Sequence, residues 1–172
     1  MSERKHLKLA TNFDKDSYGE RYAEHVLEIY KLYVEMADRI SMRRQAANSF
    51  FLTINSAIVA LVGYVNTIAK SDKSASLFYI LVAVAGMVLS YLWYRLVLSY
   101  KQLNSGKFKV IHKIEAMLPI RPYDTEWDAL GRGKDPNLYK PFTHIEIMVP
   151  WVFFFLHAVV FLVSIYTIIN PA

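Results

Sequence analysis

Three stretches without any Asp, Glu, Lys or Arg constrain this chain more than any other feature. They contain 25 residues between Arg44 and Lys70, 21 between Lys73 and Arg95, and the last 26 after Glu146. A helix of about 20 apolar residues crosses a bilayer, so each stretch is long enough. Three buried helices of a soluble protein are the alternative, but 54% of only 172 residues are apolar, which argues against it. The three predicted spans cover about 46–69, 74–94 and 148–169.

Basic residues near the ends of these spans predict their orientation, because cytoplasmic segments carry an excess of Lys and Arg. Twelve such residues flank the cytoplasmic ends that this rule assigns, whereas only Lys70 and Lys73 flank the opposite side. We therefore expect a cytoplasmic N-terminus and an external C-terminus. The chain divides into a cytoplasmic amphipathic helix (1–44), a transmembrane hairpin (45–94), a cytoplasmic helix and connector (95–146) and a third span (147–172).

Helices are expected to continue from the first two spans into the cytoplasm. No Gly or Pro occurs between Glu20 and Val62, and apolar side chains recur there with helical period. A second stripe follows the second span: Leu96, Tyr100, Leu103, Val110, Ile111, Ile114 and Leu118. The two stripes should pack on each other as a cytoplasmic collar, with Leu103 and Ile114 inside. A single hairpin has too little core to be stable alone, which predicts a homo-oligomer.

Two details of the collar can be predicted from the same stripes. Lys107 falls within the apolar stripe, so its ammonium should seek a carboxylate such as Glu24, Glu28 or one from a neighbouring subunit, or extend outward to solvent. The segment after Leu118 is rich in Pro and Gly, which predicts a folded connector with one short helix. That helix is expected at Thr125 to Leu130, capped by Asp124 or Thr125.

Polar residues within the spans are the first candidates for function. At 100° per residue, Asn48, Asn55 and Asn66 fall within about 20° of each other on the first span. Small residues form a band beside them (Ser56, Ala60, Gly63 and Thr67) and another on the second span (Ser76, Ala83, Gly86 and Ser90). Close helix packing accounts for the small residues. Each buried amide needs a hydrogen-bond partner, and a water-filled channel would supply it. The three asparagines are therefore candidates to line a pore, and packing of this face against protein is the alternative.

Little catalytic chemistry is available to the chain. The absence of cysteine excludes disulfides, thiolate zinc sites and cysteine nucleophiles, and we expect no metal, no cofactor and no small-molecule substrate. His157 within the third span could relay protons, but a hydrogen bond between helices is the favoured interpretation. Lys107 and His112 loosely match the Arg-x(4 to 6)-His motif of HEPN ribonucleases, with Lys in place of Arg. We expect neither residue to be catalytic, and the protein not to be an enzyme.

Two stretches of the chain suggest a family. The sequence WYRLVLSYKQLNSGKFKVIHKIE at 93–115, with the segment PYDTEW at 122–127, resembles the RipA-like family of small octameric bacterial membrane proteins. That resemblance implies a homo-octamer in the bacterial inner membrane, with a cytoplasmic collar around a central pore. The family is in turn similar to the membrane-pore accessory protein of type VI-B CRISPR systems, which acts after phage detection. A CRISPR effector or an RNA signal is the partner that this second likeness implies.

Three functions remain open from the sequence. The first is a regulated membrane pore in stress or antiphage defence, with Lys107, His112, Leu103 and Ile114 as collar and regulatory candidates. The second is a non-conducting membrane scaffold that recruits a cytoplasmic partner. The third is a membrane-tethered ribonuclease. In each of them the chain itself and the lipid bilayer are the expected partners.

Overall fold

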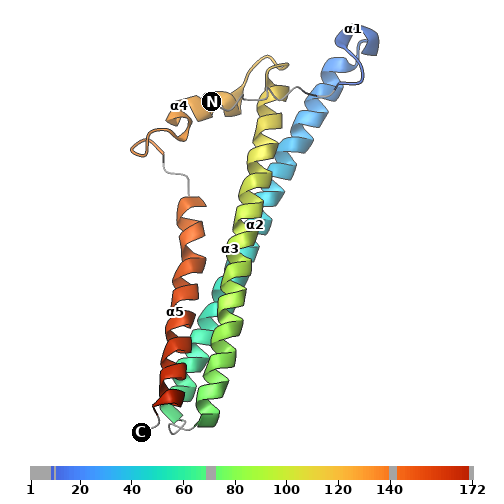
Figure 1. Ribbon diagram of the computed structural model, residues 1–172. Coiled ribbons are helices and arrows are strands. Elements are labelled where there is room, and N and C mark those ends of the chain that lie inside the picture. Colours follow the sequence, from blue (N-terminus) through green and yellow to red (C-terminus); the bar gives the residue numbers. More distant parts are fainter. Residues whose placement is uncertain (1–8, 10, 69–72, 140–142, 171–172) are drawn as a thin grey trace, which may run out of the picture. The chain divides into compact units, whose positions relative to one another are not determined.

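The computed structural model describes residues 9, 11–68, 73–139 and 143–170, and every element within them is helical. Figure 1 shows these elements along the chain. They are α1 (Lys15–Tyr18), α2 (Tyr22–Ile68), α3 (Lys73–Glu115), α4 (Pro122–Ala129), the 3-10 turn η1 (Gly131–Gly133) and α5 (Thr143–Ile169). The predicted all-α class is therefore confirmed.

The helices α2 and α3 are unusually long because nothing in their sequences interrupts them. α2 has 47 residues and α3 has 43, and neither contains proline. Three helices are long and apolar enough to cross a membrane: Tyr22–Ile68, Ala75–Glu115 and Ile145–Ile169. These contain the three predicted spans to within one residue, and residue 69 of the first span lies outside the described residues. Both α2 and α3 also continue beyond the predicted membrane boundaries, as expected. The described chain forms two compact units, and each is described separately below.

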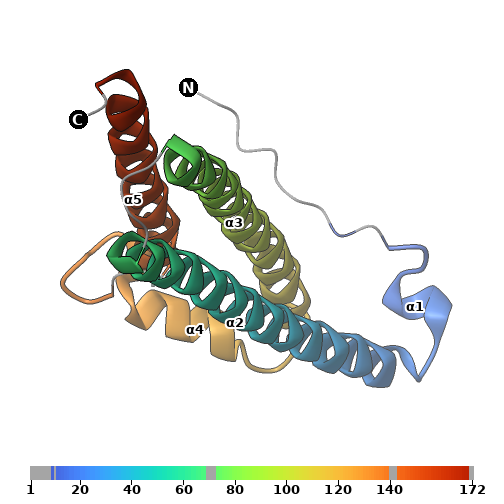
Figure 2. The same cartoon turned by 90° about the horizontal axis from the view of Figure 1, so that it is seen from below.

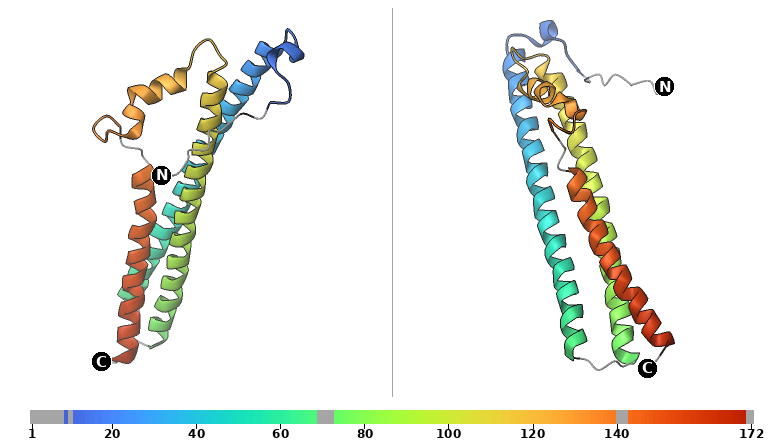
Figure 3. Two further views of the ribbon diagram at one scale, coloured as in Figure 1. Left: turned by 45° about the horizontal axis from the view of Figure 1, so that its top comes forward. Right: turned by 90° about the vertical axis from the view of Figure 1, so that its left-hand side faces the viewer.

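The first unit, here called the membrane unit, comprises Arg43–Tyr100 and Phe142–Ala172. Its parts of α2, α3 and α5 lie side by side (Figures 2 and 3). Small or polar residues dominate its buried positions, including Ala83, Ser90 and Asn55. Without water to drive apolar side chains together, helices in lipid associate through close packing and hydrogen bonds, and this composition suits both.

The second unit, here called the collar unit, comprises Met1–Met42 and Lys101–Pro141. The predicted apolar stripes form its core: Val26, Ala37 and Ile40 of α2 and Ile111 and Ile114 of α3 are buried. Leu103 differs from the prediction, because 51% of its surface is exposed. One turn further along, the longer Lys107 side chain makes the contact with α2 instead. Leu103 is therefore available for contacts outside the chain, whereas Ile114 is not.

The short connector helix begins earlier than predicted. α4 covers Pro122–Ala129, with proline at its first position, instead of Thr125 to Leu130. Proline suits that position because the first helical N–H groups have no partner within the helix, so the missing donor costs nothing. The residue before it, Arg121, makes no side-chain capping bond. The cap comes instead from Glu115 at the end of α3.

Candidate functional site

Asn55 lies at the centre of the membrane unit, where it joins all three helices. Its side chain is fully buried. The amide nitrogen Nδ2 donates to the Phe51 carbonyl at 2.9 Å, within α2. The amide oxygen Oδ1 lies 3.0 Å from Ser90 Oγ on α3 and 3.2 Å from His157 Nε2 on α5. The protein itself therefore supplies partners for the buried amide, as in the alternative that this face packs against protein.

Gly86 allows α5 to approach α3 closely at this point. A Cβ atom at position 86 would lie 2.5 Å from the imidazole ring of His157. Ser90 lies one turn further along α3, and its hydroxyl is also 2.8 Å from the Gly86 carbonyl. The small-residue band predicted on this span thus accommodates a bulky polar ring. The favoured interpretation of His157, a hydrogen bond between helices, is confirmed, and its second ring nitrogen has no partner within the described residues.

Asn48 makes a second polar contact between the same three helices. Its Oδ1 accepts a hydrogen bond from Trp93 Nε1 of α3 at 2.8 Å, and its Nδ2 donates to Glu146 Oε1 of α5 at 3.1 Å. Arg44 lies 3.6 Å from the other oxygen of Glu146. The indole of Trp93 also stacks on Phe51 with 5.9 Å between ring centroids. The structure therefore brings Asn48 and Asn55 into contacts within the chain, while Asn66 is exposed.

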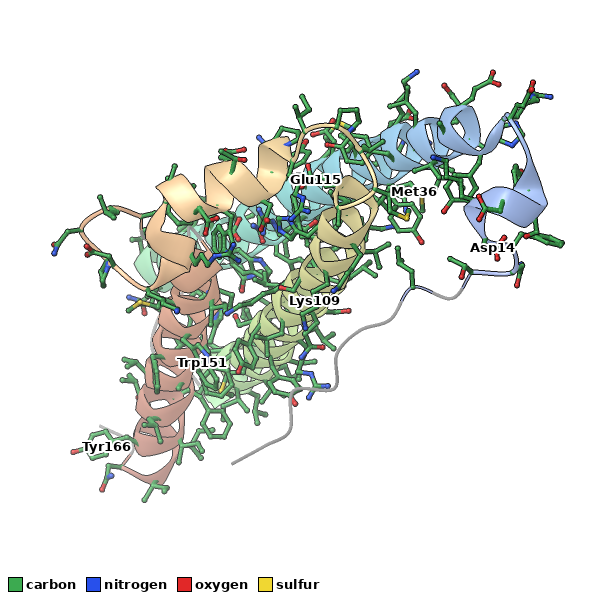
Figure 4. The ribbon with its side chains drawn as sticks, turned by 90° about the horizontal axis from the view of Figure 1, so that it is seen from above. Asp14, Met36, Lys109, Glu115, Trp151 and Tyr166 are labelled. Atoms are coloured by element: carbon green, nitrogen blue, oxygen red, sulfur yellow. The ribbon has the colours of Figure 1, made fainter. Side chains whose placement is uncertain are left out.

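The outward faces of the membrane helices differ in composition. On α5 the exposed residues repeat at heptad spacing and are large and apolar, and Tyr166 extends outward from the helix (Figure 4). The residues at this spacing are Ile145, Met148, Val152, Phe155, Val159, Leu162, Tyr166 and Ile169, and Trp151, Leu156 and Val163 are exposed beside them. On α2 an exposed stripe with the same spacing consists of small residues: Ala46, Ser49, Thr53, Ser56, Ala60, Gly63 and Thr67. We call it the small stripe. The sequence band from Ser56 to Thr67 is its C-terminal half. Large apolar residues of α2, including Phe50, Leu61 and Tyr64, are exposed beside the small stripe.

Glu115 is the polar centre of the collar unit, where the end of α3 meets α2 and α4 (Figure 4). Its carboxylate is fully buried and accepts hydrogen bonds from Tyr30 Oη at 2.9 Å and from the backbone N–H groups of Tyr123 and Asp124 at 3.0 and 3.1 Å. A carboxylate at a helix N-terminus is also favoured by the helix dipole. Sequence reasoning missed Glu115, because a cap eight residues upstream gives no local capping signal.

His112 and Lys107 lie on different sides of α3. His112 Nδ1 is 3.5 Å from Glu115 Oε2 and 4.0 Å from Asp124 of α4. Lys107 Nζ instead lies over the Tyr33 ring of α2, 5.1 Å from its centroid. Glu24 and Glu28 are paired with Arg21 and Lys31 instead. Within the chain, Lys107 contacts an aromatic face, which attracts a cation without the cost of burying a second charge. The structure does not bring Lys107 and His112 together.

The contact with Glu115 predicts that Tyr30 loses its proton at an unusually high pH. Burial, together with the hydrogen bond to Glu115 and its charge, raises the pKa of Tyr30 to about 12. Since the folded state holds this proton more tightly than the unfolded state, the stabilising contribution should be complete below pH 10 and lost as the pH rises to about 12. We expect the difference in phenolate absorbance between wild type and Tyr30→Phe to titrate near the upper value. A midpoint near 10, the ordinary value, would show that the contact does not hold the proton.

Comparison with known proteins adds one finding to this geometry. The model of the octameric membrane protein family matches residues 27–166, which is most of the chain. No curated protein matches, and neither does any solved structure. The matched range includes the polar contacts of both units.

Proposed function

The chain belongs to the octameric membrane protein family, and on that premise we propose that it forms a homo-octameric ring whose central pathway conducts ions across the bacterial inner membrane. The observation that supports this proposal is the contrast between the small stripe of α2 and the exposed face of α5. A face of large apolar side chains suits lipid, whereas exposed hydroxyl groups and a glycine within a span suit water or a neighbouring helix.

The symmetry that a membrane oligomer can adopt indicates where the two faces would lie in a ring. Copies of one chain insert with the same orientation, so two-fold axes in the membrane plane, which would invert half of them, are excluded. Closed assembly then requires one rotation axis along the membrane normal. In such a ring one helix of each subunit is nearest the axis, and the small stripe makes α2 the best suited. The resulting wall would be polar but uncharged, and therefore weakly selective among ions.

Asn55 has a different role in this proposal from the one that its position in the sequence suggested. It is buried on the inward face of α2, and its hydrogen bonds with Ser90 and His157 connect α2 to α3 and α5. Exposed Asn66 remains a candidate for the wall itself. A rigid attachment of α2 would hold its outward face in one orientation, as a pore wall requires.

The proposed biological role is stress or antiphage defence. Opening of a weakly selective pathway would collapse the membrane potential of the cell, so the pathway must stay closed until a signal arrives. The collar unit, on the cytoplasmic side by the distribution of basic residues, is the part available to such a signal, including a CRISPR effector or an RNA. We propose no enzymatic step, because Lys107 and His112 make separate contacts.

A comparison of two single cysteines tests the pore wall directly, since the natural chain contains none. Ser56 and Val159 are both exposed and lie near the midpoints of their predicted spans, but on the small stripe and on the apolar face of α5 respectively. After reconstitution in bilayers, a positively charged thiol reagent in water should reduce the conductance of Ser56→Cys several-fold. The matched variant Val159→Cys should be unaffected, because lipid excludes the reagent.

Two outcomes would contradict the proposal. Absence of conductance from assembled octamers under all applied potentials would favour the non-conducting scaffold. A conductance that is blocked through Val159→Cys but not through Ser56→Cys would place the pathway beside α5 and lipid beside α2.

A further inference from the structure

The collar unit contains an open groove with an apolar floor. The groove has a volume of about 780 Å³ and lies among α2, α3 and α4. Val34 and Ala37 of α2, Phe108 of α3 and Tyr123 of α4 contribute to its lining. Apolar surface of this kind is stabilised when another protein surface covers it.

Carboxylates with no ionic partner lie along this groove. Asp38 and Glu126 line it and are exposed, and neither forms an ion pair with any residue that the structure describes. The other charged lining residues are already paired on α2, since Glu35 is bound by Arg39 and Lys31 by Glu28. The groove therefore offers two unpaired negative charges beside an apolar floor.

A second surface of the same unit has the opposite charge. Gln102, Gly106, Lys109 and Lys113 follow one another at helical spacing on α3 and are all exposed. Neither lysine forms an ion pair within the described part of the chain. A Cβ atom at Gly106 would have no neighbour within 4 Å, so another surface can approach this face closely. We call these four residues the basic stripe.

A cyclic ring requires two such unlike surfaces on every subunit. Each subunit contacts the next through one surface and the previous one through another, so the two surfaces must be complementary to each other. In a closed ring of eight they are separated by about 135° around an axis parallel to that of the ring. At 100° per residue, the basic stripe lies about 130° around α3 from Phe108 in the groove. The opposite charges of the two surfaces and their places on different sides of α3 both fit this arrangement.

We propose that the acidic groove of each collar unit binds the basic stripe of the next copy of the chain. Lys109 and Lys113 pair with Asp38 and Glu126 across this interface, and the open surface at Gly106 lets α3 lie against the apolar floor. The proposal rests on the ring described above. It goes further by assigning which face of the collar meets which, and its test does not depend on conductance.

Disulfide trapping in the purified octamer tests the assignment. Asp38→Cys and Lys109→Cys are combined in one chain, and each is also made alone. Under a mild oxidant, the double variant should give a ladder of covalent species up to the octamer, because each subunit is then joined to both neighbours. Each single variant should stay monomeric in denaturing gels. Octamers assembled from both single variants together should give dimers only, because each chain then has one cysteine.

A charge exchange provides the second measurement. Asp38→Lys and Lys109→Asp should each reduce the octamer fraction, measured by mass in mild detergent at low salt, and the combined variant should restore it. Self-linked dimers from either single cysteine would overturn the proposal, since they would show that like surfaces meet. Failure of the combined charges to restore assembly would also overturn it. Conductance that persists after either failure would leave the pore proposal intact.

Discussion

Replacement of Glu115 by alanine should release α4 from the collar unit. Three donors lose their acceptor at once: the Tyr30 hydroxyl and the backbone N–H groups of Tyr123 and Asp124. An unsatisfied buried donor costs about 1–3 kcal/mol, so the combined effect should be about 3–5 kcal/mol. An eight-residue helix cannot persist without its tertiary contacts. We therefore expect α4 to open locally while α2 and α3 remain helical.

Hydrogen exchange measures this opening directly. The amides of Tyr123 and Asp124 should exchange at least about 100-fold faster in Glu115→Ala, since each 1.4 kcal/mol of lost protection corresponds to a factor of ten. Glu115→Gln keeps one accepting oxygen and should show a smaller change. Glu28→Ala is the matched control, because that carboxylate is exposed and forms only a surface pair with Lys31. Unchanged exchange in Glu115→Ala would mean that α4 is held by its other contacts.

Gly86→Ala should have the largest effect in the membrane unit. The added methyl group would lie 2.5 Å from the His157 ring, so either the ring must leave Asn55 or α3 and α5 must separate. Overpacking of this kind costs about 3 kcal/mol, and the hydrogen bond between His157 and Asn55 would be lost in addition. A clear fall in the thermal midpoint of the detergent-solubilised octamer is the expected result.

Two further variants distinguish this clash from a general intolerance of alanine. His157→Ala removes the ring, so combined with Gly86→Ala it should recover part of the lost stability, a coupling that a double-mutant cycle isolates. Gly63→Ala is the matched control in the neighbouring helix, where a Cβ atom would meet nothing within 4 Å. Equal losses from Gly86→Ala and Gly63→Ala would show that the close approach of His157 is not what limits position 86.

The sequence alone determined the features that depend on local composition. A bilayer crossing requires only enough consecutive apolar residues, so the three spans could be located without any knowledge of their neighbours. The continuation of α2 and α3 beyond the membrane boundaries followed from the absence of residues that interrupt a helix. Helical periodicity also identified most of the collar core, including Ile111 and Ile114.

Only the tertiary structure decided which partner each side chain meets. Periodicity shows that Asn55 lies on one face of α2, but its contact with His157 joins residues 102 positions apart. For the same reason a carboxylate was predicted beside Lys107, whereas its ammonium lies over an aromatic ring. The cap of α4 was predicted at the start of that helix, but Glu115 of α3 provides it. A stripe in the sequence fixes the direction in which a side chain points along its own helix. The groups that this side chain contacts belong to segments distant in the sequence, which come close to it only when the chain folds.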